Sequence, residues 1–170
     1  MSLPDSRGRL TTIYKGTHFT IPNPWRLWLT DVAGDATFTA DSRYDLGDSD
    51  QYDWNKLTGI TWTPLLPNYD AAMVVWRYNL DNGLYEVGPF FNDATAFVFP
   101  TRDEIISVPV DQTFGFYVDY DGITITYGDT VVRKARPEDI TPNFWTSAKI
   151  TGWFGGNRVA PKTVSYYIRM

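Results

Sequence analysis

The chain has 170 residues, with 20 acidic and 15 basic side chains, a formal net charge of −5 and a sequence pI of about 4.7. The basic residues are scattered along the sequence rather than clustered, which argues against a nucleic-acid-binding surface. No apolar run approaches the ~18 residues of a membrane-spanning helix, so no membrane segment is expected.

The length fits one domain, which we expect over residues 11–170 after a polar, flexible arm at 1–10. Cysteine is absent, so neither disulfides nor thiol chemistry contribute to the fold. The first ten residues have no apolar segment of a signal peptide. We expect a soluble protein, and the sequence leaves open an extracellular or virion-associated location.

Aromatic residues are abundant, with 7 Trp, 11 Tyr and 10 Phe. Such large, stiff side chains favour pleated sheets over helices. They also provide the flat faces on which sugar rings stack. The expected strands before residue 69 are 11–15, 18–21, 25–30, 36–40 and 56–63.

The segment 69–91 predicts a long β-hairpin. Two apolar runs, 71–79 and 84–91, flank Asp81-Asn82-Gly83, and an Asn-Gly pair readily adopts the positive φ angles of a tight turn. Alternate side chains of the first run are apolar on both faces, so we expect this strand in the middle of a sheet, covered on each side.

The expected strands after the hairpin are 94–99, 104–110, 113–120, 123–127, 130–134, 149–154 and 162–169. Turn residues recur about every eight to twelve residues between them, which is the spacing of an all-β sandwich. A single helical turn is expected within 135–145, kept short by Pro142. About twelve strands fit two packed antiparallel sheets.

Three segments carry a resemblance to a known group of proteins. The chain contains Trp153-Phe154-Gly155-Gly156-Asn157, followed by Ala160-Pro161, together with DWNKLTGITW at 53–62 and AMVVWRYN at 72–79. These resemble bacterial and phage-associated proteins with a concanavalin A-like jelly-roll fold and no settled activity. The resemblance implies a jelly-roll sandwich of the lectin and glucanase type.

Catalytic motifs known for enzymes of this fold are missing. Glucanases of this fold carry E-x-D-x-x-E, whereas the three glutamates here, Glu86, Glu104 and Glu138, have no partner at that spacing. The Gln-x-His pair of alginate lyases is absent, and the only histidine is His18. No catalytic residue is therefore predicted, and a polysaccharide lyase or hydrolase ranks third among the candidate functions.

A cluster of aspartates lies between 41 and 53. Carboxylates at short spacing in a loop are the ligands that Ca²⁺ prefers, so Ca²⁺ is the candidate cofactor. The spacing does not match an EF-hand, and a solvated loop whose aspartates cap turns is the favoured alternative. The predicted calcium ligands are Asp45, Asp48, Asp50 and Asp53, with Asp41 in the same cluster.

Arg77 and Glu86 face each other across the predicted hairpin. If their face is open, the arginine can hold a carboxylated or hydroxyl-rich ligand, and the alternative is a structural ion pair. Trp62, Trp76, Tyr117 and Trp153 are candidate stacking platforms, although alternation alone leaves open which of them face solvent. The predicted ligand-binding residues are Trp62, Arg77, Asn79, Tyr85, Glu86 and Tyr117.

Two functions follow from these features. The first is a non-catalytic carbohydrate-binding module whose partner is an oligosaccharide or polysaccharide. The second is a structural or adhesion component of a phage or cell-surface assembly, which would use the sandwich as an oligomer-forming unit. A stable homo-oligomer favours the second function, and a monomer with an aromatic groove favours the first.

Overall fold

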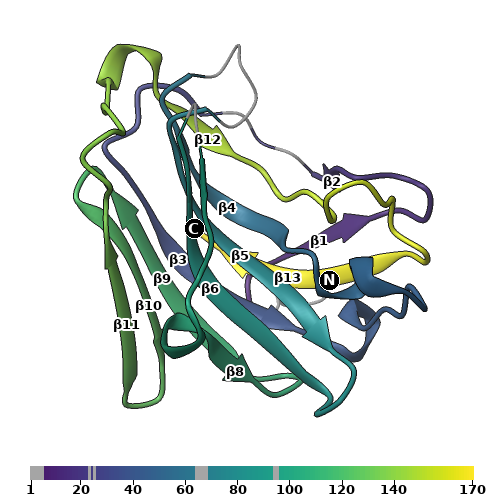
Figure 1. Cartoon of the computed structure of the whole chain (residues 1–170). Coiled ribbons are helices and arrows are strands. Elements are labelled where there is room, and N and C mark those ends of the chain that lie inside the picture. The colour runs from purple at the N-terminus through teal and green to yellow at the C-terminus, as the bar shows by residue number, and fades with distance from the viewer. Residues whose placement is uncertain (1–5, 23, 25, 64–68, 94–95) are drawn as a thin grey trace.

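The chain folds as a β-sandwich of two antiparallel sheets, as the computed structural model shows for residues 6–22, 24, 26–63, 69–93 and 96–170 (Figure 1). The predicted all-β class is confirmed, while the finer assignment to concanavalin A-like folds stays a prediction. The strands are β1 (Arg9–Ile13), β2 (Thr20–Ile21), β3 (Asp31–Phe38), β4 (Asn55–Thr61), β5 (Ala71–Asn79), β6 (Leu84–Asn92), β7 (Phe97–Val98), β8 (Ile106–Val108), β9 (Thr113–Asp119), β10 (Gly122–Tyr127), β11 (Thr130–Ala135), β12 (Ala148–Ile150) and β13 (Val164–Arg169).

The larger sheet has seven strands in the order β11-β10-β9-β3-β13-β1-β2. The smaller sheet has the order β12-β4-β5-β6-β7. β7 pairs with the C-terminal end of β6, and β8 pairs with the N-terminal half of β6 along the same edge. In Figure 1, β5 and β6 cross in front of β3 and β9, so the sheets lie face to face. Short 3₁₀ turns connect some strands, and within the described ranges no helix has the length and hydropathy needed to cross a membrane.

Aromatic side chains dominate the core between the sheets. The ring of Phe38 lies 4.6 Å from that of Trp76 and 4.7 Å from that of Tyr85, measured between centroids. Phe114 and Tyr166 complete the cluster, and all five side chains are almost fully buried. Stacked and edge-on aromatic pairs of this kind add to the stabilisation from burial alone.

The predicted hairpin is confirmed as β5 and β6, which pair along their whole lengths. Ala71 pairs with Asn92 at one end, and Asn79 pairs with Leu84 beside the turn. Of the Asn-Gly pair only Gly83 takes a positive φ, of 71°, and its N–H donates to Asn79 O at 2.9 Å. Both faces of β5 are covered, as predicted. One set of side chains joins the core, and the other forms a second apolar cluster on the outer face of the smaller sheet.

Two predicted elements are wrong. Within the predicted range 135–145 no α-helical turn forms: a single turn closes where the N–H of Ile140 donates to Pro137 O, and Pro142 prevents its continuation. A 3₁₀ turn follows at Phe144–Thr146. In the segment 25–30, Leu27 makes an isolated bridge to Ala148, and a positive φ at Trp28 interrupts the extended backbone; Trp25 lies outside the described residues.

The ends of several other elements differ from the predictions. β1 already begins at Arg9, inside the range predicted as an arm, and residues 1–5 lie outside the described part of the chain. β3 begins at Asp31 and is longer than predicted, while β2, β7 and β8 are shorter. These differences lie at element boundaries, which local sequence patterns specify least well.

Candidate functional site

The outer face of the smaller sheet carries a groove of about 640 Å³. Its base consists of Met73 and Val75 of β5 and Ile150 of β12, which belong to the buried outer cluster. The groove exists because β5 has apolar residues at both sets of alternating positions, so its outer face stays apolar where a one-sided strand would carry polar side chains. We call it the outer groove.

Aromatic rings line the outer groove on two sides. Near β7, the rings of Phe90, Phe97 and Phe99 form a cluster with centroids 5.1–6.1 Å apart. Near β4, Trp54 and Trp153 line the opposite side. β4 and β7 are three strand spacings apart in the sheet, about 14 Å, which is wider than a single sugar ring.

The rings that reach solvent are Phe97, Phe99 and Trp153, with 64%, 52% and 39% of their surfaces exposed. Trp153 is held in place by its backbone, since its N–H and C=O both bond to Lys56 of β4. The imidazole of His18 stacks on its indole at 4.8 Å and nearly parallel. These contacts make Trp153 a fixed platform at the edge of the outer groove.

Polar groups in the outer groove are few and specific. Asn92 of β6 is 5% exposed, and its buried Oδ1 has no hydrogen-bond partner among the residues that the structure describes. Lys56, Asp53 and Thr61 also line the groove. A buried amide oxygen without a partner is costly, and a donor on a ligand in the groove would satisfy it after a rotation of the Asn92 side chain that exposes the oxygen.

Lys56 is mostly buried beside Trp153, with its ammonium 5.9 Å from the ring centroid. Burial lowers the pKa of Lys56 from 10.5 to about 8. Between these two pKa values the unfolded chain binds more protons than the folded chain. The buried charge therefore lowers the free energy of unfolding by its full amount below about pH 8, and this loss decreases as the pH rises toward 10.5.

Lys56→Met is accordingly expected to raise the free energy of unfolding at neutral pH by about 1–3 kcal/mol. The advantage over the parent should shrink as pH approaches about 10, because the parent then loses the buried charge. Urea unfolding of both proteins across this range measures the difference, in which the titration of all other groups cancels. A difference independent of pH would contradict the expectation.

The structure brings together three of the six predicted ligand-binding residues. Glu86 accepts from Arg77 Nε at 2.6 Å and from Asn79 Nδ2 at 2.8 Å, all on the outer face of the hairpin. Arg77 also donates to Tyr52 O and stacks on Trp54, with its guanidinium carbon 4.2 Å from the ring centroid. This network lies next to the outer groove and supports one of its aromatic walls.

The other three predicted residues lie elsewhere. Trp62 and Tyr85 are buried between the sheets, where Trp62 packs edge-on against Tyr120 and Tyr85 donates to Thr39 O. Tyr117 is 43% exposed, but it belongs to β9 in the other sheet. None of the three lines the outer groove.

The aspartate cluster docks the loop that follows Trp153. Arg158 forms ion pairs with Asp48 and Asp50. Gly156 lies so close to Asp53 that a β-carbon there would sit 2.7 Å from a carboxylate oxygen, which explains a glycine at this position. The contact joins two of the three segments that carry the family resemblance, because Asn55 Oδ1 also accepts from the N–H of Gly155.

Two predicted calcium ligands also have local roles. Asp45 and Asp48 accept hydrogen bonds from the backbone N–H groups two residues later, at Gly47 and Asp50, as the turn-capping alternative expects. Within the described ranges, no group of three or more His, Cys, Asp or Glu side chains is placed to hold a metal ion. Calcium binding at this loop stays a prediction.

Sequence patterns gave partial signals for the groove. Trp153 was among the candidate platforms, whereas Trp54, Lys56, Asn92, Phe97 and Phe99 were not singled out. The alternation Phe97-Val98-Phe99 places two rings on one face and would have identified that wall.

Comparisons with known proteins add little beyond the fold. No protein-family model matches the sequence, and no curated protein matches it. Among solved structures, the chain is similar to sheep galectin-11 in complex with glycerol, at 11% identity and a TM-score of 0.30, over 96% of this chain and 99% of that chain. The description of the sandwich therefore rests on the two sheets themselves.

Proposed function

We propose that the protein is a non-catalytic carbohydrate-binding module and that the outer groove holds the glycan. The observation that carries the proposal is the placement of exposed rings, Trp153 on one side and Phe97 and Phe99 on the other, around the unpaired amide oxygen of Asn92. The apolar C–H faces of sugars pack on aromatic rings, while their hydroxyls donate to carbonyl and carboxylate oxygens.

The span of the groove favours an oligosaccharide or polysaccharide over a monosaccharide, because its aromatic walls are separated by two intervening strands. Lys56 adds a preference for acidic sugars, since a lysine with a pKa of about 8 is mostly protonated at neutral pH. Asp53 at the same side limits this preference and can accept from sugar hydroxyls.

A thermal-shift screen against neutral and acidic polysaccharides tests the proposal. A glycan at 100 times its Kd stabilises the fold by about 2.7 kcal/mol, which raises Tm by several degrees for a chain of this size. Phe97→Ala should reduce the shift. Val131→Ala is the matched control, because Val131 is equally exposed, at 63%, but lies on β11 of the other sheet. An equal shift in both variants, or none in the parent, would contradict the proposal.

The same screen, run with Ca²⁺ and with a chelator, tests calcium binding. A rise in Tm with Ca²⁺ that is lost in an Asp48→Asn, Asp50→Asn double variant would support a site in the aspartate loop. No effect of Ca²⁺ on the parent would end that idea.

A structural role in an assembly is the second candidate function. Large apolar side chains gather where β12 begins, and Trp145 and Trp28 there are 78% and 60% exposed. Leu27 and Phe144 adjoin them. A homo-oligomer would cover such side chains. Light scattering on the purified protein distinguishes the two functions: a stable trimer or larger species favours assembly, and a monomer favours glycan binding.

A further inference from the structure

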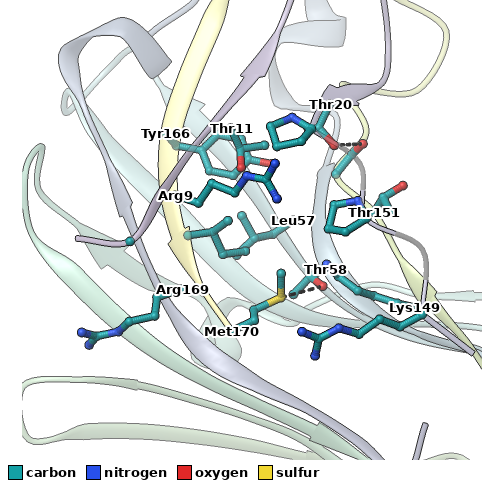
Figure 2. Close-up of a pocket in the computed structure, with 16 residues that line it drawn as sticks. Arg9, Thr11, Thr20, Leu57, Thr58, Lys149, Thr151, Tyr166, Arg169 and Met170 are labelled. Carbon is teal, nitrogen blue, oxygen red and sulfur yellow. Dashed lines mark hydrogen bonds between the residues drawn. The ribbon is translucent and has the colours of Figure 1, made fainter. Parts of the chain in front are cut away.

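A second pocket opens between the edges of the two sheets (Figure 2) and adjoins the outer groove at Lys149 and Thr151, which line both. It has a volume of about 310 Å³ and is bounded by β1, β2 and β13 on one side and by β4 and β12 on the other. Lys149 pairs with Ile60 of β4, whose side chain enters the core, so the side chain of Lys149 also points to the inner face and into this pocket. The neighbouring side chains of Ala148 and Ile150 point to the outer face and the outer groove. We call it the edge pocket.

The charge in the edge pocket contrasts with that of the whole chain. Four of the 15 basic residues line it, and no acidic residue does, although the chain carries a net charge of −5. The four are Arg9, Arg26, Lys149 and Arg169. Basic residues that are scattered along the sequence are thus gathered by the sheet topology into one place.

Among the described residues, an acidic side chain neutralises only one of the four cations. Arg169 binds the carboxylate of Asp35 at 2.6 and 3.0 Å, and Figure 2 shows it pointing away from the centre of the pocket. Arg9, Arg26 and Lys149 form no ion pair within the described residues. In Figure 2 the guanidinium of Arg9 extends across the pocket instead.

Lys149 is the most costly of these charges. Lys149 is only 9% exposed, and its ammonium group makes no hydrogen bond or ion pair in the described part of the chain. Burial, together with the positive charges of Arg26 and Arg9, lowers the pKa of Lys149 to about 8. Proteins rarely bury an unpaired cation beside two others, because desolvation and repulsion both oppose it. A bound anion would remove both costs.

Neutral groups of the pocket fit an anion as well. The hydroxyl of Thr11, on β1 beside Arg9, makes no hydrogen bond within the described ranges and is available as a donor. Thr20 and Thr58 already donate to Gly152 O and Ile150 O. The pocket volume equals that of about ten liquid waters, so it accommodates an oxyanion group with part of the molecule that carries it.

We propose that the edge pocket binds a small oxyanion, a carboxylate, sulfate or phosphate group, through Arg9, Arg26, Lys149 and the hydroxyl of Thr11. Arginine holds such groups in bidentate fashion, and Lys149 supplies a compact charge from the buried side. The two pockets share Lys149 and Thr151, so Arg9, Arg26 and Thr11, which line the edge pocket and not the outer groove, distinguish this site from glycan binding in the groove.

Calorimetric titration of the parent with sodium sulfate, sodium phosphate and sodium glucuronate at constant ionic strength tests this site. Direct titration is needed because sulfate and phosphate stabilise folded proteins without binding a specific site. Saturable binding of at least one anion is expected. Binding of glucuronate alone indicates an anionic sugar, and binding of the inorganic anions indicates a free oxyanion. Because the outer groove is itself expected to favour acidic sugars, either result supports the edge pocket only when Arg26→Gln weakens the binding.

Lys149→Met and Arg26→Gln are each expected to weaken this binding by about tenfold or more, because each removes a charged hydrogen-bond donor. Arg26 is exposed, so Arg26→Gln tests the site even if Lys149→Met does not fold. Arg133→Gln is the matched control and should leave the Kd unchanged, because Arg133 lies on β11, at the opposite edge of the larger sheet from β1 and β2. Absence of saturable binding by the parent, or an unchanged Kd in Arg26→Gln, would overturn the proposal.

Discussion

Trp76→Ala is expected to lower the free energy of unfolding by about 3–5 kcal/mol, which is the usual cost of truncating a buried aromatic residue. Trp76 is fully buried at the centre of the core and has ring contacts with Phe38, Tyr44, Tyr85 and Tyr166. Rings from both sheets meet on this indole, so the cavity left by alanine cannot be closed by movement of one strand. Urea unfolding measures the change.

Two further variants control this experiment. Trp145→Ala removes the same side chain at a site that is 78% exposed, and its free energy of unfolding should differ from the parent by less than about 0.5 kcal/mol. Trp76→Phe should cost less than Trp76→Ala, because the phenyl ring fills most of the cavity that alanine leaves. Similar losses for Trp76→Ala and Trp145→Ala would contradict the description of the core.

Arg77→Met is expected to destabilise the fold by about 2–4 kcal/mol, since it leaves the carboxylate of Glu86 buried with Asn79 as its remaining side-chain partner. The side chains of Arg77 and Glu86 are 20% and 12% exposed, so water replaces the lost ion pair poorly. The variant also loses the stacking of the guanidinium on Trp54.

A double-mutant cycle separates the ion pair from the other contacts of Arg77. Arg77→Met, Glu86→Met should be more stable than Arg77→Met alone, because an apolar pair leaves no uncompensated charge on this face. Free energies of unfolding from urea titrations at pH 7 supply the four corners of the cycle. Strictly additive losses would show that the two side chains are not coupled.

The hairpin could be predicted because its determinants are local. Alternation within 71–79 specified two covered faces, and the bounds of the two runs placed Arg77 and Glu86 on paired strands near the turn. The structure supplies the register that pairs them directly. The prediction of a strand at 25–30 was wrong for a reason that residue propensities do not contain. Its aromatic and apolar residues fit a strand, but a positive φ at Trp28 breaks the extended backbone.

The candidate site was predictable only in part because it depends on the order of strands. Trp153 reaches the outer groove through its pairing with Lys56, almost a hundred residues earlier, and Phe97 faces it from the far edge of the sheet. No local pattern specifies that order. Similarly, alternation shows that Trp62 and Tyr117 each have a preferred face, but in a sandwich of two sheets either face can be core or surface.

The edge pocket illustrates the same limit for charge. Arg9, Arg26 and Lys149 are separated by many residues, so the sequence showed scattered basic residues in an acidic chain. The antiparallel pairing of β1 with β13 and of β12 with β4 brings them to one opening. Net charge therefore described the average surface of the protein and missed a pocket whose charged side chains, among the described residues, are all basic.

The most direct test of glycan binding in the outer groove is a calorimetric titration with the polysaccharide that gives the largest thermal shift, comparing the parent with Trp153→Ala and Trp145→Ala. Trp153→Ala is expected to weaken binding by about 30-fold, the equivalent of ~2 kcal/mol for loss of a tryptophan that packs against the ligand. Trp145→Ala, which removes an exposed tryptophan outside the groove, should bind like the parent. Equal affinity of Trp153→Ala and the parent would contradict the assignment of the glycan to this groove.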